Sequence, residues 1–182
     1  MRSFVALPVS QPDLADELYV TGQSLRLGRV VARDNLHLTL AFLDNQPEAK
    51  LRELHEGLID VSAPPLQLTF TGLDIFGGSK PRLAYAAVRP DSNLVALRNE
   101  IRNVARLAGI KLSRERFVPH VTLVRFSRND FPQGLQNLPH TLAAASSRTL
   151  PPLHVEEFVL YQSRLFSDGP RYDRLAAYPL GD

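Results

Sequence analysis

One pattern limits the fold of this chain more than any other: a short strand in which a histidine and a threonine alternate with large apolar residues. In the segment DNLHLTLAFL, residues 34–43, the large apolar residues fill every second position: Leu36, Leu38, Leu40 and Phe42. This alternation is typical of a β-strand with one buried face. His37 and Thr39 therefore point together to the other face. Taken alone, that face has an ordinary interpretation as an exposed polar strand surface.

The same pattern occurs a second time. In FVPHVTLVRF, residues 117–126, His120 and Thr122 share one strand face, while Val121 and Leu123 share the opposite one. A single His-x-Thr strand carries little information, but two of them in one chain indicate a common purpose.

The spacing of the two motifs predicts an internal duplication. The histidines are 83 residues apart, close to half of the 182-residue chain, and each motif follows a strand and a helix-bearing segment. We therefore predict one bilobal domain over residues 1–182, with motif strands near 36–43 and 119–125. Its halves would face each other across a pseudo-twofold axis, which would bring both His-Thr pairs into one cleft.

The remainder of the chain alternates between strand and helix patterns. Further strands are expected at 3–9, 65–76, 82–90, 154–165 and 171–180, the last two joined as an antiparallel hairpin. Helices are expected from Pro12 to about residue 27, from Pro47 through the stripe Leu51, Leu54 and Leu58, and from a cap at Asp91 or Ser92 to Gly109. Residues 127–153 are rich in Pro, Ser and Asn, which predicts a long surface connection with one short strand at TLAAA.

These elements predict an α+β fold of two pseudo-symmetric halves. Each half would contain a mainly antiparallel sheet with helices on the outside, and the active cleft would lie between the sheets.

Composition excludes several classes of protein. A chain that is 44% hydrophobic and 22% charged is expected to be folded and soluble. The absence of cysteine excludes disulfides, thiolate zinc sites and a cysteine nucleophile. No apolar run is long enough for a membrane span, and the start, MRSFVALPVSQPD, lacks the core of a secretory signal. We therefore expect a cytoplasmic protein, and we expect it to be a monomer. The five histidines lack the spacing of a metal site, so no metal or cofactor is expected.

The positive charge of the chain is carried almost entirely by arginine. The net charge is only +2, but 18 of the 21 basic residues are Arg, the side chain best suited to bidentate phosphate contacts. Arg98, Arg102 and Arg106 share one face of the third expected helix. We interpret this row as a solvated face, with a nucleic-acid track as the alternative. Lys80 and Arg82, in the turn FGGSKPR, are candidates to reach a phosphate at the rim of the cleft.

Five residues after each histidine the two motifs differ. The positions hold Phe42 and Arg125, which suit a base-stacking platform and a phosphate clamp. Strict alternation, however, points both to the core side. We therefore expect Phe42 to be a core residue, and Arg125 to mark an end or a bulge of its strand, because an arginine is not buried without a partner.

The paired motifs resemble a known family. His-Leu-Thr-Leu and His-Val-Thr-Leu, with the flanks DNLHLTLAFL and PHVTLVR, are similar to the two-histidine phosphoesterase superfamily, and within it to bacterial RNA 2′,3′-cyclic phosphodiesterases, also called 2′-5′ RNA ligases. The resemblance covers nearly the whole chain. It implies metal-independent opening of RNA 2′,3′-cyclic phosphate ends to 2′-phosphates, with His37 protonating the leaving 3′ oxygen and His120 activating water. It also implies substrate contacts from Thr39, Thr122 and Arg125, and reverse 2′-5′ ligation with an RNA 5′ hydroxyl.

The chemistry of these residue types agrees with that reaction. Opening a cyclic phosphodiester needs one group to take a proton from water and another to protonate the departing ribose oxygen. Imidazole does both near neutral pH, and threonine hydroxyls donate to the non-bridging phosphate oxygens. Two alternatives remain open at this point: an enzyme for a small cyclic phosphate, such as a nucleotide or ADP-ribose derivative, and a nucleotide- or RNA-binding module without turnover.

Overall fold

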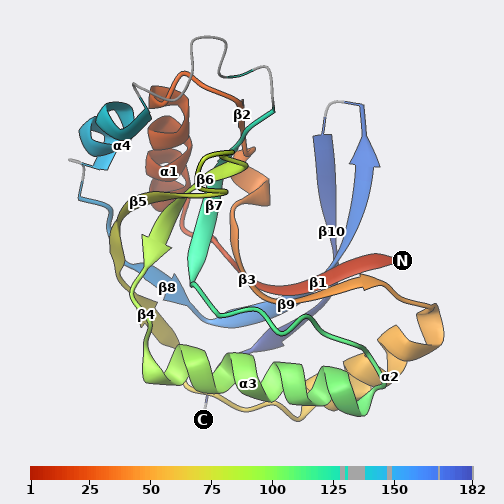
Figure 1. Ribbon diagram of the computed structural model, residues 1–182. Helices are drawn as coiled ribbons and strands as arrows, with labels where there is room; N and C mark the ends of the chain where they lie inside the picture. Colours follow the sequence, from red (N-terminus) through yellow and green to blue (C-terminus); the bar gives the residue numbers. More distant parts are fainter. Residues whose placement is uncertain (128–129, 131–137, 147–148, 168, 182) are drawn as a thin grey trace.

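The computed structural model describes residues 1–127, 130, 138–146, 149–167 and 169–181. Its order of elements is β1 (Arg2–Pro8), α1 (Pro12–Ser24), β2 (Arg29–Val30), a 3₁₀ turn (Arg33–Asn35), β3 (His37–Asn45), α2 (Glu48–Ile59), β4 (Leu66–Leu68), β5 (Phe70–Phe76), β6 (Leu83–Val88), α3 (Ser92–Leu107), β7 (His120–Arg125), α4 (Leu138–Ser146), β8 (Leu153–Val155), β9 (Glu157–Phe166) and β10 (Gly169–Pro179). Figure 1 shows these elements in space.

The main sheet consists of two half-sheets. Its strands run in the order β10-β9-β1-β3-β7-β6-β5, with β2 paired to β7, and all of its pairings are antiparallel. The half-sheets β10-β9-β1-β3 and β7-β6-β5 pair with each other at one residue pair, Leu38 with Val121. We call this pair the seam. Beyond it the half-sheets diverge (Figure 1). A small second sheet pairs β4 with β8.

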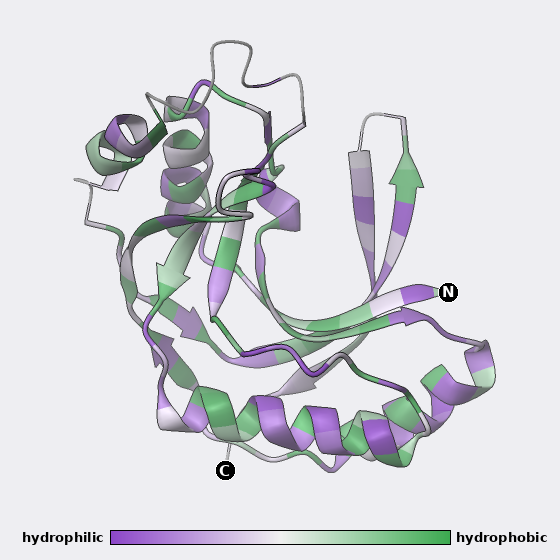
Figure 2. Cartoon of the chain, viewed as in Figure 1, coloured by the Kyte–Doolittle hydropathy of each residue, from purple (hydrophilic) through white to green (hydrophobic). Residues whose placement is uncertain are grey.

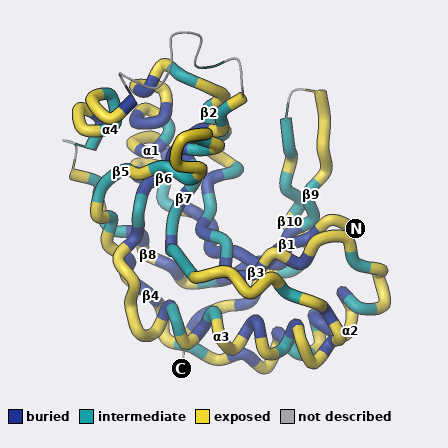
Figure 3. The backbone as a smooth tube through the Cα atoms, viewed as in Figure 1, coloured by how far each residue is buried: buried dark blue, intermediate teal, exposed yellow. Residues whose placement is uncertain are grey.

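The α+β architecture with mainly antiparallel strands is thus the one predicted. The two predicted sheets are continuous at the seam, so the halves share a core. The expected hairpin is also confirmed, since β9 and β10 pair along almost their whole length. Toward its far end β9 is exposed from Arg164 onward (Figure 3), while β10 contacts the 3₁₀ turn through a hydrogen bond from the Asn35 side chain to the Pro170 carbonyl oxygen.

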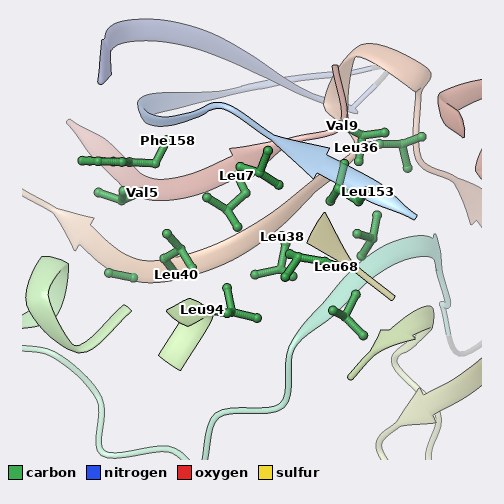
Figure 4. Packing of buried hydrophobic residues seen from close by; sticks show 14 of the residues in the cluster. Val5, Leu7, Val9, Leu36, Leu38, Leu40, Leu68, Leu94, Leu153 and Phe158 are labelled. Carbon is green, nitrogen blue, oxygen red and sulfur yellow. The ribbon is translucent and has the colours of Figure 1, made fainter. Parts of the chain in front are cut away.

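The core lies behind the seam. Large aliphatic side chains from β1, β3, α3 and the small sheet meet there, as Figure 4 shows for Leu7, Leu38, Leu68, Leu94 and Leu153. Each of these side chains is at most 1% exposed. Their burial gives the main free-energy gain on folding and fixes which face of β3 is left for polar residues.

The two longest helices cross from one half to the other. Helix α1 starts with Pro12, and it packs on β7 although it follows β1. Helix α3 is capped by the Asp91 carboxylate, which accepts hydrogen bonds from the N–H groups of Asn93 and Leu94, and it packs on β3 although it follows β6. Apolar and polar residues alternate around α3 as an amphipathic helix requires (Figure 2). This exchange of helices ties the half-sheets together.

Two local predictions are wrong. The segment TLAAA lies in helix α4 and not in a strand, because alanine and leucine favour a helix where no strand partner is offered. The single strand expected at 65–76 is divided into β4 and β5, which belong to different sheets. Parts of the predicted surface connection, at 128–129, 131–137 and 147–148, lie outside the described residues.

Among the helices that the structure describes, none combines the length and the apolar character needed to cross a membrane.

Candidate active site

The seam brings the four polar residues of the two motifs to one face of the sheet. In an antiparallel pair, the residue before one partner lies opposite the residue after the other. Leu38 and Val121 are fully buried, so their strand neighbours point away from the core. The resulting cross-strand neighbours are His37 with Thr122, and Thr39 with His120. All four are partly exposed.

Both imidazoles are oriented in the same way by the backbone. The Nδ1 atom of His37 lies 2.6 Å from the carbonyl oxygen of Asn35, and that of His120 lies 2.7 Å from the carbonyl oxygen of Val118. A carbonyl oxygen only accepts hydrogen bonds, so each Nδ1–H is the donor. The Nε2 atom of each neutral ring therefore keeps its lone pair available for proton transfer.

Burial makes His37 hard to protonate. Its ring packs against Phe4, with the ring centres 4.8 Å apart. Loss of hydration, opposed in part by the hydrogen bond to Asn35 and aided by the positive charges of Arg125 and His120, lowers the pKa of His37 to about 4. The influence of Arg125 and His120 places both groups in the electrostatic neighbourhood of this imidazole.

His120 has a similar environment on the other side of the seam. Its ring lies 4.9 Å from that of Phe76 and 5.0 Å from that of Tyr85, measured between centres. Burial lowers the pKa of His120, as does the charge of Arg125, and the hydrogen bond to Val118 acts in the opposite direction. Without substrate, both histidines are therefore biased toward the neutral form.

Matching bulges in the two motif strands overturn the strict alternation. The pairing of β3 with β1 shifts register so that Leu40 is an extra residue, and the pairing of β7 with β6 shifts so that Leu123 is one. Both lie three positions after a motif histidine. An extra residue reverses the face to which the later residues of a strand point, so Phe42 and Arg125 turn outward.

The prediction that Phe42 belongs to the core is therefore wrong. Its side chain is 41% exposed, with the Arg2 guanidinium 5.3 Å from the centre of its ring. For Arg125 the expected irregularity is confirmed: its strand ends there, two residues after the bulge at Leu123, and Arg125 is exposed. Neither the bulge position nor its repetition is visible in the alternation of the sequence.

Two cavities flank the histidine pair. One, of about 220 Å³, is lined by Arg125 together with residues of β2, the 3₁₀ turn and β10, among them Asn35 and Tyr172. The other, of about 290 Å³, contains Thr39 and His120 in its wall. We call the second one the arginine cavity, because its wall includes Arg82, Arg98, Arg102 and Arg116. The seam lies between the two, so a bound chain has room on either side of the reacting group.

The prediction that the arginine row of α3 forms a solvated face is wrong for two of its three residues. Only Arg106 lies on the solvated face that was predicted. Arg102 is 8% exposed, and both Arg98 and Arg102 line the arginine cavity. The available signal was position: Arg98 and Arg102 directly follow the buried Leu97 and Ile101, which sets them at the border of the buried stripe.

No group of three or more histidine, cysteine, aspartate or glutamate side chains that could hold a metal ion is found in the part of the chain that the structure describes. The chemistry available at the seam is that of two imidazoles, two hydroxyls and a guanidinium. Together these groups can transfer protons and stabilise a negatively charged phosphate.

The chain is similar to known proteins along nearly its whole length. The family model of the 2′-5′ RNA ligase superfamily matches residues 12–164. An RNA 2′,3′-cyclic phosphodiesterase of Geobacillus stearothermophilus is 32% identical over 156 residues, which cover 82% of this chain and about half, 47%, of that protein. An Archaeoglobus fulgidus protein of the same name is 28% identical over 186 residues, which cover 98% of this chain and 99% of that protein. The crystal structure of E. coli LigT complexed with 3′-AMP has a TM-score of 0.78 at 27% identity, covering 100% of this chain and 98% of that one.

A fold of helices on an antiparallel sheet in which two His-x-Thr strands meet defines the class of two-histidine phosphoesterases. Within this class, the chain belongs to the 2′-5′ RNA ligase superfamily.

Proposed function

We propose that this protein hydrolyses RNA 2′,3′-cyclic phosphate ends to 2′-phosphates, with one motif histidine as general base and the other as general acid. The observation that carries the proposal is the seam, which sets two similarly oriented imidazoles beside two threonine hydroxyls on one face. The family membership and the names of the relatives support the same activity.

The reaction is an in-line displacement at phosphorus. The Nε2 atom of His120 takes a proton from a water molecule, and the water oxygen forms a bond to phosphorus. The bond from phosphorus to the 3′ oxygen breaks, and His37 donates a proton to that oxygen. The product carries a 2′-phosphate and a free 3′ hydroxyl, and the two histidines have exchanged protonation states. This assignment of acid and base follows the family resemblance.

The other polar residues stabilise charge in this scheme. Thr39 and Thr122 donate hydrogen bonds to the non-bridging phosphate oxygens, on which negative charge builds up in the transition state. Arg125, exposed at the end of β7, attracts the phosphate and also raises the cost of protonating either histidine in the empty site. An anionic phosphodiester offsets that cost, so substrate binding itself favours protonation of the general acid.

The same groups support 2′-5′ ligation. If an RNA 5′ hydroxyl takes the place of water, His120 accepts its proton, the 5′ oxygen forms a bond to phosphorus, the bond to the 3′ oxygen breaks with a proton from His37, and a 2′-5′ linkage results. The cavities on both sides of the seam leave room for two RNA ends.

Incubation with a panel of 2′,3′-cyclic-phosphate oligonucleotides and mononucleotides tests the proposal. We expect 2′-phosphate products, identified by product mapping, with the rate unchanged in EDTA because the side chains named above suffice. Complete loss of activity in EDTA with recovery on adding a divalent ion would contradict the mechanism. Turnover of mononucleotides alone would favour a small cyclic phosphate as the substrate, and binding without turnover would favour a binding module.

A further inference from the structure

We infer that Arg98 binds the phosphodiester that precedes the cyclic-phosphate nucleotide, so that the arginine cavity selects an RNA chain over a mononucleotide. This inference rests on the proposed function and adds a residue that determines the substrate class. It concerns a part of the wall that takes no part in proton transfer.

The position of Arg98 is unfavourable for stability. In the described part of the chain, its Nε atom is buried and has no hydrogen-bond partner, and its guanidinium forms no ion pair. A buried donor without an acceptor destabilises the folded protein. Burial and the charges of Arg102 and Arg106 lower the pKa of Arg98, which means that its neighbours repel its charge. An anion in the cavity would relieve this repulsion.

The guanidinium is nevertheless held in a fixed orientation. It lies over the ring of Phe117, with Cζ 4.3 Å from the ring centre. Its neighbour one turn along α3, Arg102, is held in place by a 2.5 Å hydrogen bond from Nη2 to the Ser113 carbonyl oxygen. A stacked, immobilised guanidinium has already lost the side-chain freedom that a flexible surface arginine loses on binding, which favours affinity.

The charge of the cavity suits a nucleic-acid backbone. Its wall contains four arginines, and Glu115 is the one acidic side chain among its described lining residues. Thr39 and His120 belong to the same wall, so the arginines face the space next to the reacting phosphate.

The direction of the chain follows from the substrate. A 2′,3′-cyclic phosphate occurs at the 3′ end of an RNA, and the next phosphate lies one nucleotide away on the 5′ side. A mononucleotide with a 5′ hydroxyl lacks that phosphate. A cationic cavity one step from the histidines therefore distinguishes an RNA end from a cyclic mononucleotide.

The test compares Arg98→Gln with the wild type on two substrates, a trinucleotide and a mononucleotide, both ending in a 2′,3′-cyclic phosphate. We expect kcat/KM for the trinucleotide to fall about tenfold to a hundredfold, the scale of one lost charge-assisted phosphate contact. For the mononucleotide we expect a change of less than about threefold on the same reasoning. Arg106→Gln is the matched control, because Arg106 lies in the same helical row but outside the cavity wall, and neither rate should change.

A second arm changes the substrate, so that its first measurement uses the wild type alone. Replacing the penultimate phosphate of the trinucleotide with an uncharged methylphosphonate should lower kcat/KM of the wild type by the same factor, and should have little further effect in Arg98→Gln. An equal loss on both substrates in Arg98→Gln would overturn the inference, as would a methylphosphonate that the wild type tolerates. A penalty that persists in Arg98→Gln but disappears in Arg29→Gln would place the chain in the other cavity and overturn it as well. Failure of the wild type to hydrolyse either substrate would instead refute the proposed function.

Discussion

Two backbone carbonyls determine which nitrogen of each motif histidine faces the substrate. Each carbonyl belongs to the residue two positions before the histidine, Asn35 in one motif and Val118 in the other. The alternating pattern predicts that the histidine and the threonine of each motif share one strand face. The tautomer was not predictable, because it depends on the backbone path just before each strand.

Removing either histidine should cost almost as much as removing both. We expect His37→Ala and His120→Ala each to lower kcat at least on the order of a hundredfold, and the double variant to be little worse, because an acid and a base act as a unit. His154→Ala, which removes an exposed histidine of β8, is the control. Single-turnover kinetics on a cyclic-phosphate oligonucleotide measure the effect. If His120→Ala kept most of the activity, the pairing of the two motifs would be wrong.

The optimum of kcat/KM should lie on the acid side of neutrality. This parameter reports the free enzyme, in which the pKa of His37 is lowered to about 4 and that of His120 is also lowered. Because a lowered pKa means that the imidazolium is lost at lower pH, the alkaline limb should fall below the ordinary histidine pKa of about 6.5. In the pH profile of kcat, the alkaline limb should lie at higher pH, since the bound phosphate anion stabilises the imidazolium. If the alkaline limbs of kcat/KM and kcat coincided and both lay above pH 7, the lowered pKa values of the histidines would be contradicted.

The nature of the leaving group separates the acid from the base. A p-nitrophenolate leaves without protonation, so an aryl phosphodiester of a nucleotide has no need of the general acid. We expect His37→Ala to lose at least tenfold less activity on the aryl ester than on the cyclic phosphate, and His120→Ala to lose similar activity on both. The opposite result would exchange the two roles without affecting the paired mechanism.

At the scale of the strand, the two bulges explain why the sequence pattern predicts the face of some residues correctly and of others wrongly. The alternation of apolar residues predicts the correct strand face for the positions up to Leu40 and Leu123. It predicts the wrong face for Phe42 and Arg125, just beyond them. A bulge depends on the partner strand, and no single-strand pattern contains the partner. On helix α3 the amphipathic stripe was predicted correctly, but the arginines at its border were not assigned to a cavity, because the facing wall comes from β3, β7 and residues before β7.

Gly28 supports the end of β7 and should not tolerate a side chain. It has φ of +67°, and a Cβ atom there would lie 2.7 Å from the carbonyl oxygen of Arg125. The left-handed backbone alone costs alanine about 1–2 kcal/mol, and the clash adds to it. Gly78→Ala is the matched control, with φ of +52° but no atom within 4 Å.

We expect Gly28→Ala to lower the melting temperature by at least twice as much as Gly78→Ala, where about 1 kcal/mol corresponds to 2–4 °C in a chain of this size. Only Gly28→Ala should also reduce activity, through displacement of Arg125. Equal shifts in the two variants would mean that β7 adapts to the added methyl group.

For the whole molecule, the exchange of α1 and α3 predicts that both halves unfold together. Leu18 of α1 and Leu97 of α3 are at most 2% exposed, and each helix packs on the opposite half-sheet. Leu18→Ala and Leu97→Ala should each lower the stability by about 2–5 kcal/mol. Calorimetry should still show one transition, with equal calorimetric and van't Hoff enthalpies. Two separated transitions in either variant would mean that the halves are independent domains.

The order of strands and helices along the chain was largely predictable, because hydrophobic periods and helix caps are local. The spacing of the motifs also predicted that the two histidines meet. The single domain with an internal duplication remains a prediction, in keeping with the equivalent positions of Leu38 and Val121 in the two motifs. The seam and the crossing of α1 and α3 depend on contacts between distant segments, and no local signal carries them.

The seam has a consequence for how such an enzyme can change over evolutionary time. Two half-sheets that meet at one residue pair can alter their mutual angle without breaking the hydrogen bonds within either, and the helices packed across them set that angle. Substitutions in the apolar layer beneath α1 and α3 can therefore widen or narrow the space around the reacting phosphate. Preference for larger or smaller substrates can then shift through the interior of the protein, while His37, Thr39, His120 and Thr122 stay as they are.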